Sequence, residues 1–206
     1  MNQNSSLAVA AALLTSSMAA ADPVDNPSDY TQTFDAGRIK IGTLPETDFN
    51  GVSIAGTVLD TAGDIFIPAD GITVPDITVC SPLGDVILHF VSLSDQTGSL
   101  NAVTGDAAFN ISLRIFLMNP NFPPDCRVDE IDVALTTGTD GTLTGVAYSM
   151  DDGTATYVNN SFTVPTTSDC GFFGTLIDAY VGLPADVGVN YINNMHGTFD
   201  TIFVGS

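Results

Sequence analysis

The chain has 206 residues, and the 44% of them that are hydrophobic favour a packed globule over a disordered chain. Its 24 Asp and Glu stand against four Lys and Arg, and the resulting formal charge of -20 makes nucleic acid and anionic membrane unfavourable partners. The sequence contains no phosphate-cradling glycine loop, dinucleotide fingerprint or Cys-His zinc pattern, so we expect no nucleotide, redox or zinc cofactor.

The first residues have the features of a secretory signal peptide, which we place at residues 1–21. An apolar stretch at residues 7–14 is followed by small residues, with Ala19 and Ala21 at the spacing that a signal peptidase reads. Residues 22–29 contain two prolines and are expected to form a flexible lead-in. No later segment approaches about 18 uninterrupted apolar residues, so we predict no membrane span. We expect a protein that is secreted or held at the cell surface.

From residue 30 onward, apolar and polar residues mostly alternate, and Gly, Pro, Asp and Thr interrupt the pattern at short intervals. In residues 109–118 every odd-numbered residue is apolar, whereas Asn110, Ser112 and Arg114 fall on the opposite face. The alternation predicts strands at residues 38–44, 52–59, 64–67, 72–79, 85–93, 109–118, 128–135, 143–149, 154–164 and 189–203.

Asp-Gly pairs at residues 140–141 and 152–153 are typical of tight hairpins between such strands. Many short strands separated by frequent turns favour an all-β fold, either an antiparallel sandwich or a barrel. We expect the antiparallel β-sandwich, with about 9–10 strands and one short helix near residues 171–181. It should form a single domain over residues 30–206.

The expected helix follows the segment "TTSDCG", in which Ser168 or Asp169 could serve as its N-cap. Gly182 and Pro184 should end it. Its apolar residues recur at helical spacing, so it should cover an open end of the sandwich, either as a simple buried cap or as a lid over a ligand. The residues that would cover such a pocket are Phe172, Phe173, Leu176 and Tyr180.

The three cysteines, at positions 80, 126 and 170, allow three pairings in an exported protein. We favour Cys126 with Cys170, because Cys126 lies in a proline-rich loop and Cys170 starts the helix, so a disulfide would fasten the helix to the loop. Cys80 would then be left as a buried thiol or as an intermolecular link. The wide spacing of the three argues against a zinc site.

Calcium is the metal ion that the acidic segments could hold. "PPDCRVDEID" carries Asp125, Asp129 and Asp132, and the hairpin "YSMDDGT" carries Asp151 and Asp152. Hard cations take several such oxygens, although neither segment matches an EF-hand loop. The alternative is that these aspartates are ordinary solvated turn residues.

Catalytic motifs are weak in this chain, and we expect no enzyme. The two histidines, His89 and His196, lie in strand-like segments, and "GVSIAG" lacks the spacing of a serine nucleophile turn. Paired acids at residues 129–132 and 151–152 leave an acidic hydrolase as an alternative. Such an enzyme would need two carboxyl groups facing each other across a cleft, about 5 to 9.5 Å apart.

One segment carries a resemblance to a known group of proteins. The motif "GVAYSMDDGTATYVNNSFTVPTTSDCG", followed by "LIDAYVGLPADVGVN", is similar to the C-terminal part of secreted proteins of unknown function from high-GC Gram-positive bacteria. The resemblance covers about a quarter of the chain and implies an exported β-sandwich, with no activity attached to it. The matching positions are Gly145, Tyr148, Gly153, Ala155, Val158, Phe162, Val164, Pro165, Cys170, Gly182, Leu183, Pro184 and Asn190.

Three functions follow as expectations. The first is a non-enzymatic extracellular or cell-envelope protein with a structural or adhesive role, whose partner would be an envelope component or an extracellular ligand. The second is a binding module for a sugar, lipid or other small ligand, held between the sheets or under the helix. The third is the acidic hydrolase with an Asp pair.

Overall fold

The computed structural model describes residues 28–59, 63–101 and 103–199. The predicted signal peptide and residues 22–27 of the predicted lead-in lie outside this range. The first strand already begins at Ser28, inside the segment expected to be a lead-in. The elements are β1 (Ser28–Lys40), β2 (Thr47–Asp48), β3 (Val52–Val58), β4 (Asp64–Ile67), the 3-10 turn η1 (Ala69–Gly71), β5 (Ile72–Thr73), β6 (Ile77–Ser81), β7 (Gly84–Ser92), β8 (Gln96–Leu100), β9 (Ala107–Met118), β10 (Arg127–Thr136), β11 (Thr139–Asp140), β12 (Leu143–Thr144), β13 (Val146–Ser149), β14 (Thr154–Asn159), β15 (Thr167–Ser168), α1 (Phe173–Val181) and β16 (Tyr191–Phe199).

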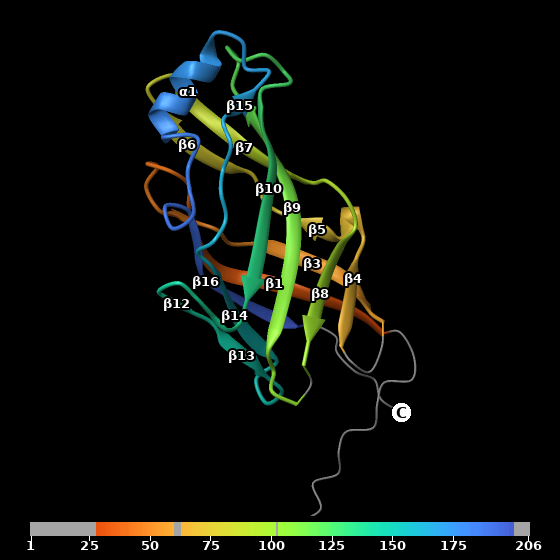
Figure 1. Cartoon of the computed structure of the whole chain (residues 1–206). Helices are drawn as coiled ribbons and strands as arrows, with labels where there is room; N and C mark the ends of the chain where they lie inside the picture. The colour runs from red at the N-terminus through yellow and green to blue at the C-terminus, as the bar shows by residue number, and fades with distance from the viewer. Residues whose placement is uncertain (1–27, 60–62, 102, 200–206) are drawn as a thin grey trace, which may run out of the picture.

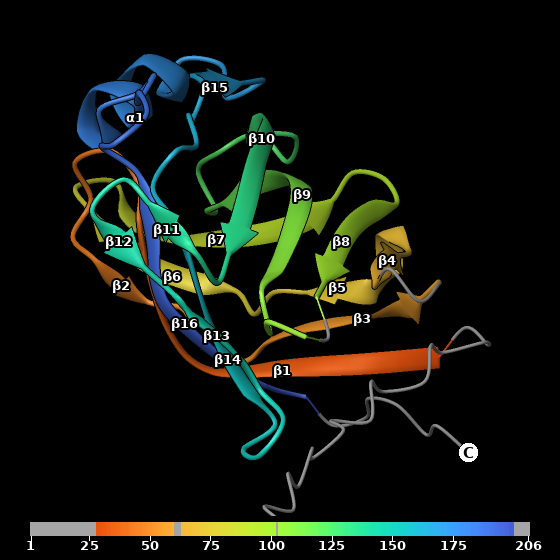
Figure 2. The same ribbon diagram turned by 60° about the horizontal axis from the view of Figure 1, so that its bottom comes forward.

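An antiparallel sheet that closes on itself dominates the fold (Figures 1 and 2). Eight strands follow one another around a barrel in the order β10, β14, β16, β1, β3, β4, β8 and β9, and β9 pairs again with β10. The predicted all-β fold with one short helix is therefore confirmed. The expected sandwich needs correction, because the strand pairing is that of a closed barrel with extra strands and is not clearly that of two packed sheets.

Strand β9 explains why the sheet closes. Along one edge, its first half pairs with β8 and its second half with β7, while its other edge pairs with β10. The circle is completed where Thr136 of β10 pairs with Val158 of β14. Irregularities in β1 between Phe34 and Arg38 bend that strand, as bulges do in closed sheets. Alternation in the sequence is the same for a sandwich and a barrel, so only these pairings distinguish the two.

The alternation predicted for β9 is confirmed. Phe109, Ile111, Ile115 and Leu117 are buried and face the barrel interior, together with the half-buried Leu113. Asn110, on the outer face, is exposed, and the neighbouring outer positions are partly exposed. One strand thus supplies core on one side and polar surface on the other.

Other strand predictions were incomplete. The segment 72–79 divides into β5 and β6 around Pro75, which has no backbone N–H to donate to a ladder. The segment 154–164 ends as a strand at Asn159. Strand β8 was missed, because "QTGSL" has no large apolar residue before Leu100 and its buried position is taken by Gln96.

Helix α1 covers one end of the molecule, above β6 and β7 (Figure 1). It begins at Phe173 with Phe172 as N-cap and no side-chain cap, so the predicted caps Ser168 and Asp169 were wrong. The predicted stop is confirmed, because Gly182 adopts a left-handed conformation (φ 76°) and donates its N–H to the Asp178 carbonyl.

The predicted disulfide between Cys126 and Cys170 is present and joins the start of β10 to the segment before α1. The two Cα atoms lie 4.2 Å apart and both half-cystines are buried. Two residues of β15 pair with Arg127 and Val128 beside it. The helix is therefore tied to the barrel as the sequence indicated.

Candidate functional site

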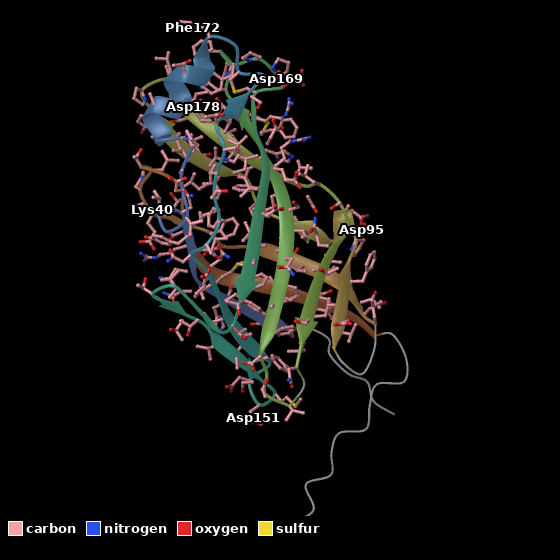
Figure 3. The ribbon with its side chains drawn as sticks, in the orientation of Figure 1. Lys40, Asp95, Asp151, Asp169, Phe172 and Asp178 are labelled. Atoms are coloured by element: carbon pink, nitrogen blue, oxygen red, sulfur yellow. A yellow bond between two sulfur atoms is a disulfide. The ribbon has the colours of Figure 1, made fainter. Side chains whose placement is uncertain are left out.

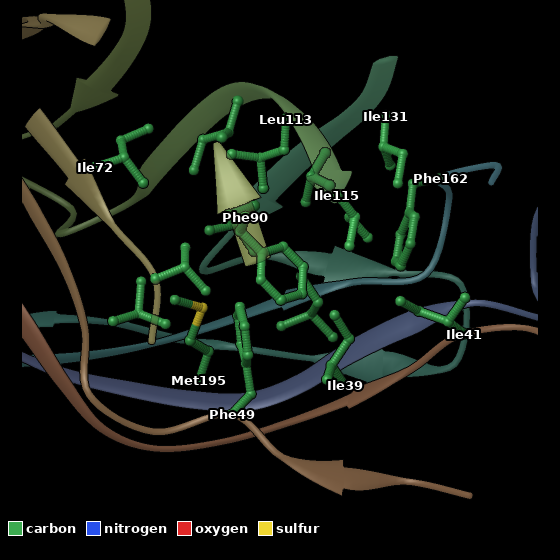
Figure 4. Close-up of a pocket in the computed structure, with 16 residues that line it drawn as sticks. Ile39, Ile41, Phe49, Ile72, Phe90, Leu113, Ile115, Ile131, Phe162 and Met195 are labelled. Atoms are coloured by element: carbon green, nitrogen blue, oxygen red, sulfur yellow. The ribbon is translucent and has the colours of Figure 1, made fainter. Parts of the chain in front are cut away.

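The barrel interior is a packed apolar core (Figure 4). Its central cavity measures only about 30 Å³, whereas pockets for small ligands usually measure about 300 to 1,000 Å³. The lining is entirely hydrophobic and includes Phe49, Phe90, Ile115 and Met195. The interior therefore offers a place for core packing and not for a ligand of the size expected from the sequence.

The space beneath α1 is similarly small, at about 40 Å³. Of the four residues expected to cover a pocket, only Tyr180 lines this space. Phe173 packs against Phe122, with ring centroids 5.3 Å apart. Phe172 and Leu176 face solvent, and Phe172 is 81% exposed (Figure 3). The inner face of the helix is formed by Ile177, Tyr180 and Val181, which line this space, whereas the expected Phe172 and Leu176 do not line it.

A third hollow, larger than the two apolar cavities, is a groove on the outer face of the barrel, across β8, β9 and β10. We call it the β8–β10 groove, and its volume is about 410 Å³. It lies beside Asp95, which is labelled in Figure 3 at the start of β8. Its lining consists of Asp95, Gln96, Thr97, Asn110, Ile111, Ser112, Asp132, Val133 and Ala134.

The groove forms where β9 changes partners. Its pairing with β8 ends at Asn110 and its pairing with β7 begins at Leu113, so the residues between them need other hydrogen-bond partners. The Gln96 side chain supplies one, because its Oε1 accepts a hydrogen bond of 3.1 Å from the Ser112 N–H. Its Nε2 donates to the Ser94 carbonyl at 2.7 Å. Buried Gln96 thus satisfies polar groups of the junction, together with the Leu93 N–H, which donates to the Ser112 carbonyl at 3.1 Å.

Two carboxylates, one in the groove lining and one beside it, meet a hydroxyl of the lining. Ser112 Oγ lies 3.0 Å from Glu130 Oε1 and also forms a short hydrogen bond with Asp132 Oδ1. A hydroxyl has one proton, so Ser112 donates to one carboxylate at a time. An irregularity in β10 between Val128 and Ile131 brings both acids to the outer face. Both lie on one strand and therefore do not face each other across a cleft.

Asp129, a predicted calcium ligand, belongs to an ion-pair network near the disulfide. Its Oδ1 lies 2.8 Å from Arg127 Nε and 3.4 Å from Arg114 Nε. The Arg127 guanidinium, with help from a Ser168 hydrogen bond and the Arg114 charge, lowers the pKa of the Asp129 carboxyl. The neighbouring Asp125 offers its backbone carbonyl to Arg127 at 3.1 Å.

The other predicted calcium ligands lie elsewhere. Asp132 is in the groove, and Asp151 and Asp152 are on the β13–β14 hairpin at the opposite end of the molecule from Asp169 (Figure 3). There the Asp152 carboxylate accepts a hydrogen bond of 3.2 Å from Ser149. The structure does not bring the five residues together, and the described residues contain no group of three or more His, Cys, Asp or Glu placed to hold a metal ion.

The two histidines each form one pair with an aspartate. His89 Nδ1 lies 2.8 Å from Asp76, and His196 Nδ1 lies 2.9 Å from Asp35. The hydrogen bond from His196 is the main cause of the lowered pKa of Asp35. Neither imidazole has a serine or cysteine as hydrogen-bond partner within the part of the chain that the structure describes. These pairs therefore lack the nucleophile of a hydrolytic triad.

Cys80 lies on the exposed face of β6, which removes the buried-thiol alternative. Opposite it on β7 is Asp85, whose carboxylate raises the pKa of the thiol. Helix α1 reaches the same strand, since the Tyr180 hydroxyl donates to the Cys80 carbonyl at 3.1 Å. A thiol with a raised pKa has less of the nucleophilic thiolate form.

Sequence reasoning found part of the groove and missed the rest. Asp132 was singled out for calcium, and Asn110 and Ser112 were expected on the outer face of β9. Asp95 and Gln96 were missed with β8, and only the unusual polar run from residue 94 to 99 marks them.

Within the described residues, no helix has the length and hydrophobicity needed to cross a membrane, and α1 spans nine residues. No protein-family model, curated protein or solved structure matches the chain. The resemblance of residues 145–190 to secreted proteins therefore stays an expectation from the motif alone.

Proposed function

We propose that this chain is an exported, non-enzymatic β-barrel protein with an adhesive role in the extracellular space or cell envelope, and that it binds its ligand in the β8–β10 groove. The observation that carries the proposal is the contrast in size between this groove, at about 410 Å³, and the small apolar cavities inside the barrel and under α1. The disulfide supports the compartment, because such bonds persist in oxidising surroundings.

The chemistry of the groove favours a ligand rich in hydrogen-bond donors and bearing positive charge. Asp95 and Asp132 line it and Glu130 lies beside it, whereas the lining contains no Lys or Arg. Asn110 and Thr97 add amide and hydroxyl groups of the kind that meet sugar hydroxyls. An amine-bearing saccharide at the surface of a cell combines these properties, and it is the ligand class we infer.

Glucosamine trimer, with free amines, is a suitable probe, and its N-acetylated form is a neutral control of the same shape. Calorimetric titration at low salt should give the amine form an affinity about tenfold higher, equivalent to about 1.4 kcal/mol from two or three exposed charge contacts. The difference should shrink as salt is added.

A matched pair of variants separates the groove from the general negative charge of the protein. Asp132→Asn and Asp151→Asn remove the same charge, the first in the groove and the second on the distant hairpin. Only Asp132→Asn should abolish the preference for the amine form. Equal weakening by both variants would show that the trimer responds to net charge, and the proposed site would then be wrong.

The acidic hydrolase has less support. Glu130 and Asp132 meet at one hydroxyl on the same strand, and the Asp95 carboxylate accepts a hydrogen bond of 3.0 Å from the Ala69 N–H. Both arrangements are those of fixed structural acids. Release of shorter sugars from the trimer during the titration would instead favour the hydrolase.

A further inference from the structure

Three polar side chains lie inside the barrel and have no role in the groove. Tyr30 and Gln32 point inward from β1 and Tyr157 from β14, and their exposed fractions are 2%, 0% and 0%. Four of their atoms are buried without a hydrogen-bond partner among the described residues, namely the two tyrosine hydroxyls and the Gln32 Oε1 and Nε2. Buried polar groups in proteins are nearly always hydrogen-bonded, so this cluster needs a partner.

Ring contacts of the two tyrosines, and the position of Gln32 on β1, bring the three residues together. The Phe109 ring packs against both tyrosines, with ring centroids 6.4 Å from Tyr30 and 5.4 Å from Tyr157. Tyr157 also meets the Phe34 ring at 5.7 Å, and Gln32 lies between Tyr30 and Phe34 on the same face of β1. The Gln32 amide is close enough to lower the pKa of the Tyr157 hydroxyl, against a larger rise caused by burial, although the two groups lack hydrogen-bond geometry. The four polar atoms therefore share one small region.

The surrounding backbone leaves room for these side chains. A Cβ at Gly197 of β16 would lie 2.7 Å from Gln32 Nε2 and 2.8 Å from the Phe34 ring. A Cβ at Gly56 of β3 would lie 2.8 Å from the Tyr30 ring. Glycines on the two strands that flank β1 thus face the cluster, and a side chain at either position would collide with it.

We propose that Tyr30, Gln32 and Tyr157 form an internal water-binding site within the barrel. A water molecule can donate to Gln32 Oε1, or accept from Gln32 Nε2, while it exchanges further hydrogen bonds with the two tyrosine hydroxyls. This gives it the two to four polar partners that buried water usually has. We infer water rather than a larger solute, because the cavity described in the interior is apolar and is lined by other residues.

The test has two independent readouts on the whole folded protein. A crystal structure at a resolution that shows ordered solvent should place water within hydrogen-bond distance of the Gln32 amide and of a tyrosine hydroxyl. Magnetic relaxation dispersion of the water oxygen measures how many water molecules are bound with a long residence time, and this count should include the water at the proposed site. In Tyr157→Phe, which keeps the ring, the count should fall, whereas it should not change in Tyr148→Phe, a matched variant of a less buried tyrosine.

A direct hydrogen bond from Gln32 to Tyr157 in the crystal, with no water between or beside them, would overturn the proposal. An unchanged count of long-lived water in Tyr157→Phe would also overturn it. If Tyr157→Phe does not fold, the crystal structure of the unaltered protein still decides the question.

Discussion

Arg127 Nη1 lies 2.5 Å from Asp169 Oδ2, and the two residues are the direct chain neighbours of Cys126 and Cys170, which form the disulfide. A covalent bond and an ion pair therefore tie the same two segments side by side. The ion pair is solvent-exposed on its Asp169 side, so it should contribute about 0 to 1 kcal/mol. The covalent link should dominate the attachment of α1.

Replacing both half-cystines by alanine should lower the free energy of unfolding by about 4 kcal/mol. The reason is the 44-residue separation, since opening a loop of that length restores entropy to the unfolded chain. Urea unfolding monitored by circular dichroism measures the loss. Cys80→Ser, which changes the exposed free thiol, is the control and should shift stability by less than about 0.5 kcal/mol. A double variant as stable as the control would contradict the attachment described above.

Acid should destabilise the protein partly through Asp129. Because its folded pKa is lowered by Arg127, the ionised form stabilises the fold above the unfolded pKa of about 3.9. This stabilisation is lost as the pH falls from about 3.9 through the lower pKa that Asp129 has in the folded protein. Asp129→Asn should therefore be less stable than the unaltered protein at pH 7, and the difference should narrow with acidification. Thermal melts across this pH range measure the difference, and a gap that stays constant with pH would refute the linkage.

Alkali should destabilise the protein through its two buried tyrosines, Tyr30 and Tyr157. Burial raises the pKa of both Tyr30 and Tyr157, so their neutral forms stabilise the fold fully below the unfolded pKa of about 10. This stability should decline as the pH rises above that value. Absorbance of tyrosinate should show two of the five tyrosines ionising only as the protein unfolds. Titration of all five before any change in circular dichroism would contradict their burial.

Calcium should raise the melting temperature no more than magnesium does at the same ionic strength. The aspartates considered for it lie in three separate places, and Asp129 and Asp132 already have Arg and Ser partners. A specific site would stabilise the folded state by mass action, so a larger rise in melting temperature with calcium than with magnesium would contradict this prediction. Loss of that shift in Asp132→Asn but not in Asp151→Asn would then locate the ion in the groove.

The sequence was informative wherever a local pattern determines the structure. The alternation in β9, the stop at Gly182 and the proximity of Cys126 to Cys170 each follow from spacing or from the residue type. Closure of the barrel depends on pairings between distant strands, such as Thr136 with Val158, which no local pattern encodes.

The groove was harder to predict for a related reason. Gln96 is buried because β9 exchanges β8 for β7 at that point, and the polar run at residues 94–99 gives no sign of which of its side chains is buried. The faces of α1 were also ambiguous, since apolar residues occur on both sides, and packing against Phe122 rather than periodicity makes Phe173 an inward residue.

Mapping of backbone amide shifts by NMR, during titration with glucosamine trimer, tests most directly whether the ligand site is on the outside of the barrel. We predict the largest shifts at Thr97, Asn110, Ser112 and Asp132, with Asp132→Asn reducing them and Asp151→Asn leaving them unchanged. Shifts centred on α1 or on core residues such as Met195, or no shift at any residue, would contradict the assignment of the β8–β10 groove as the binding site.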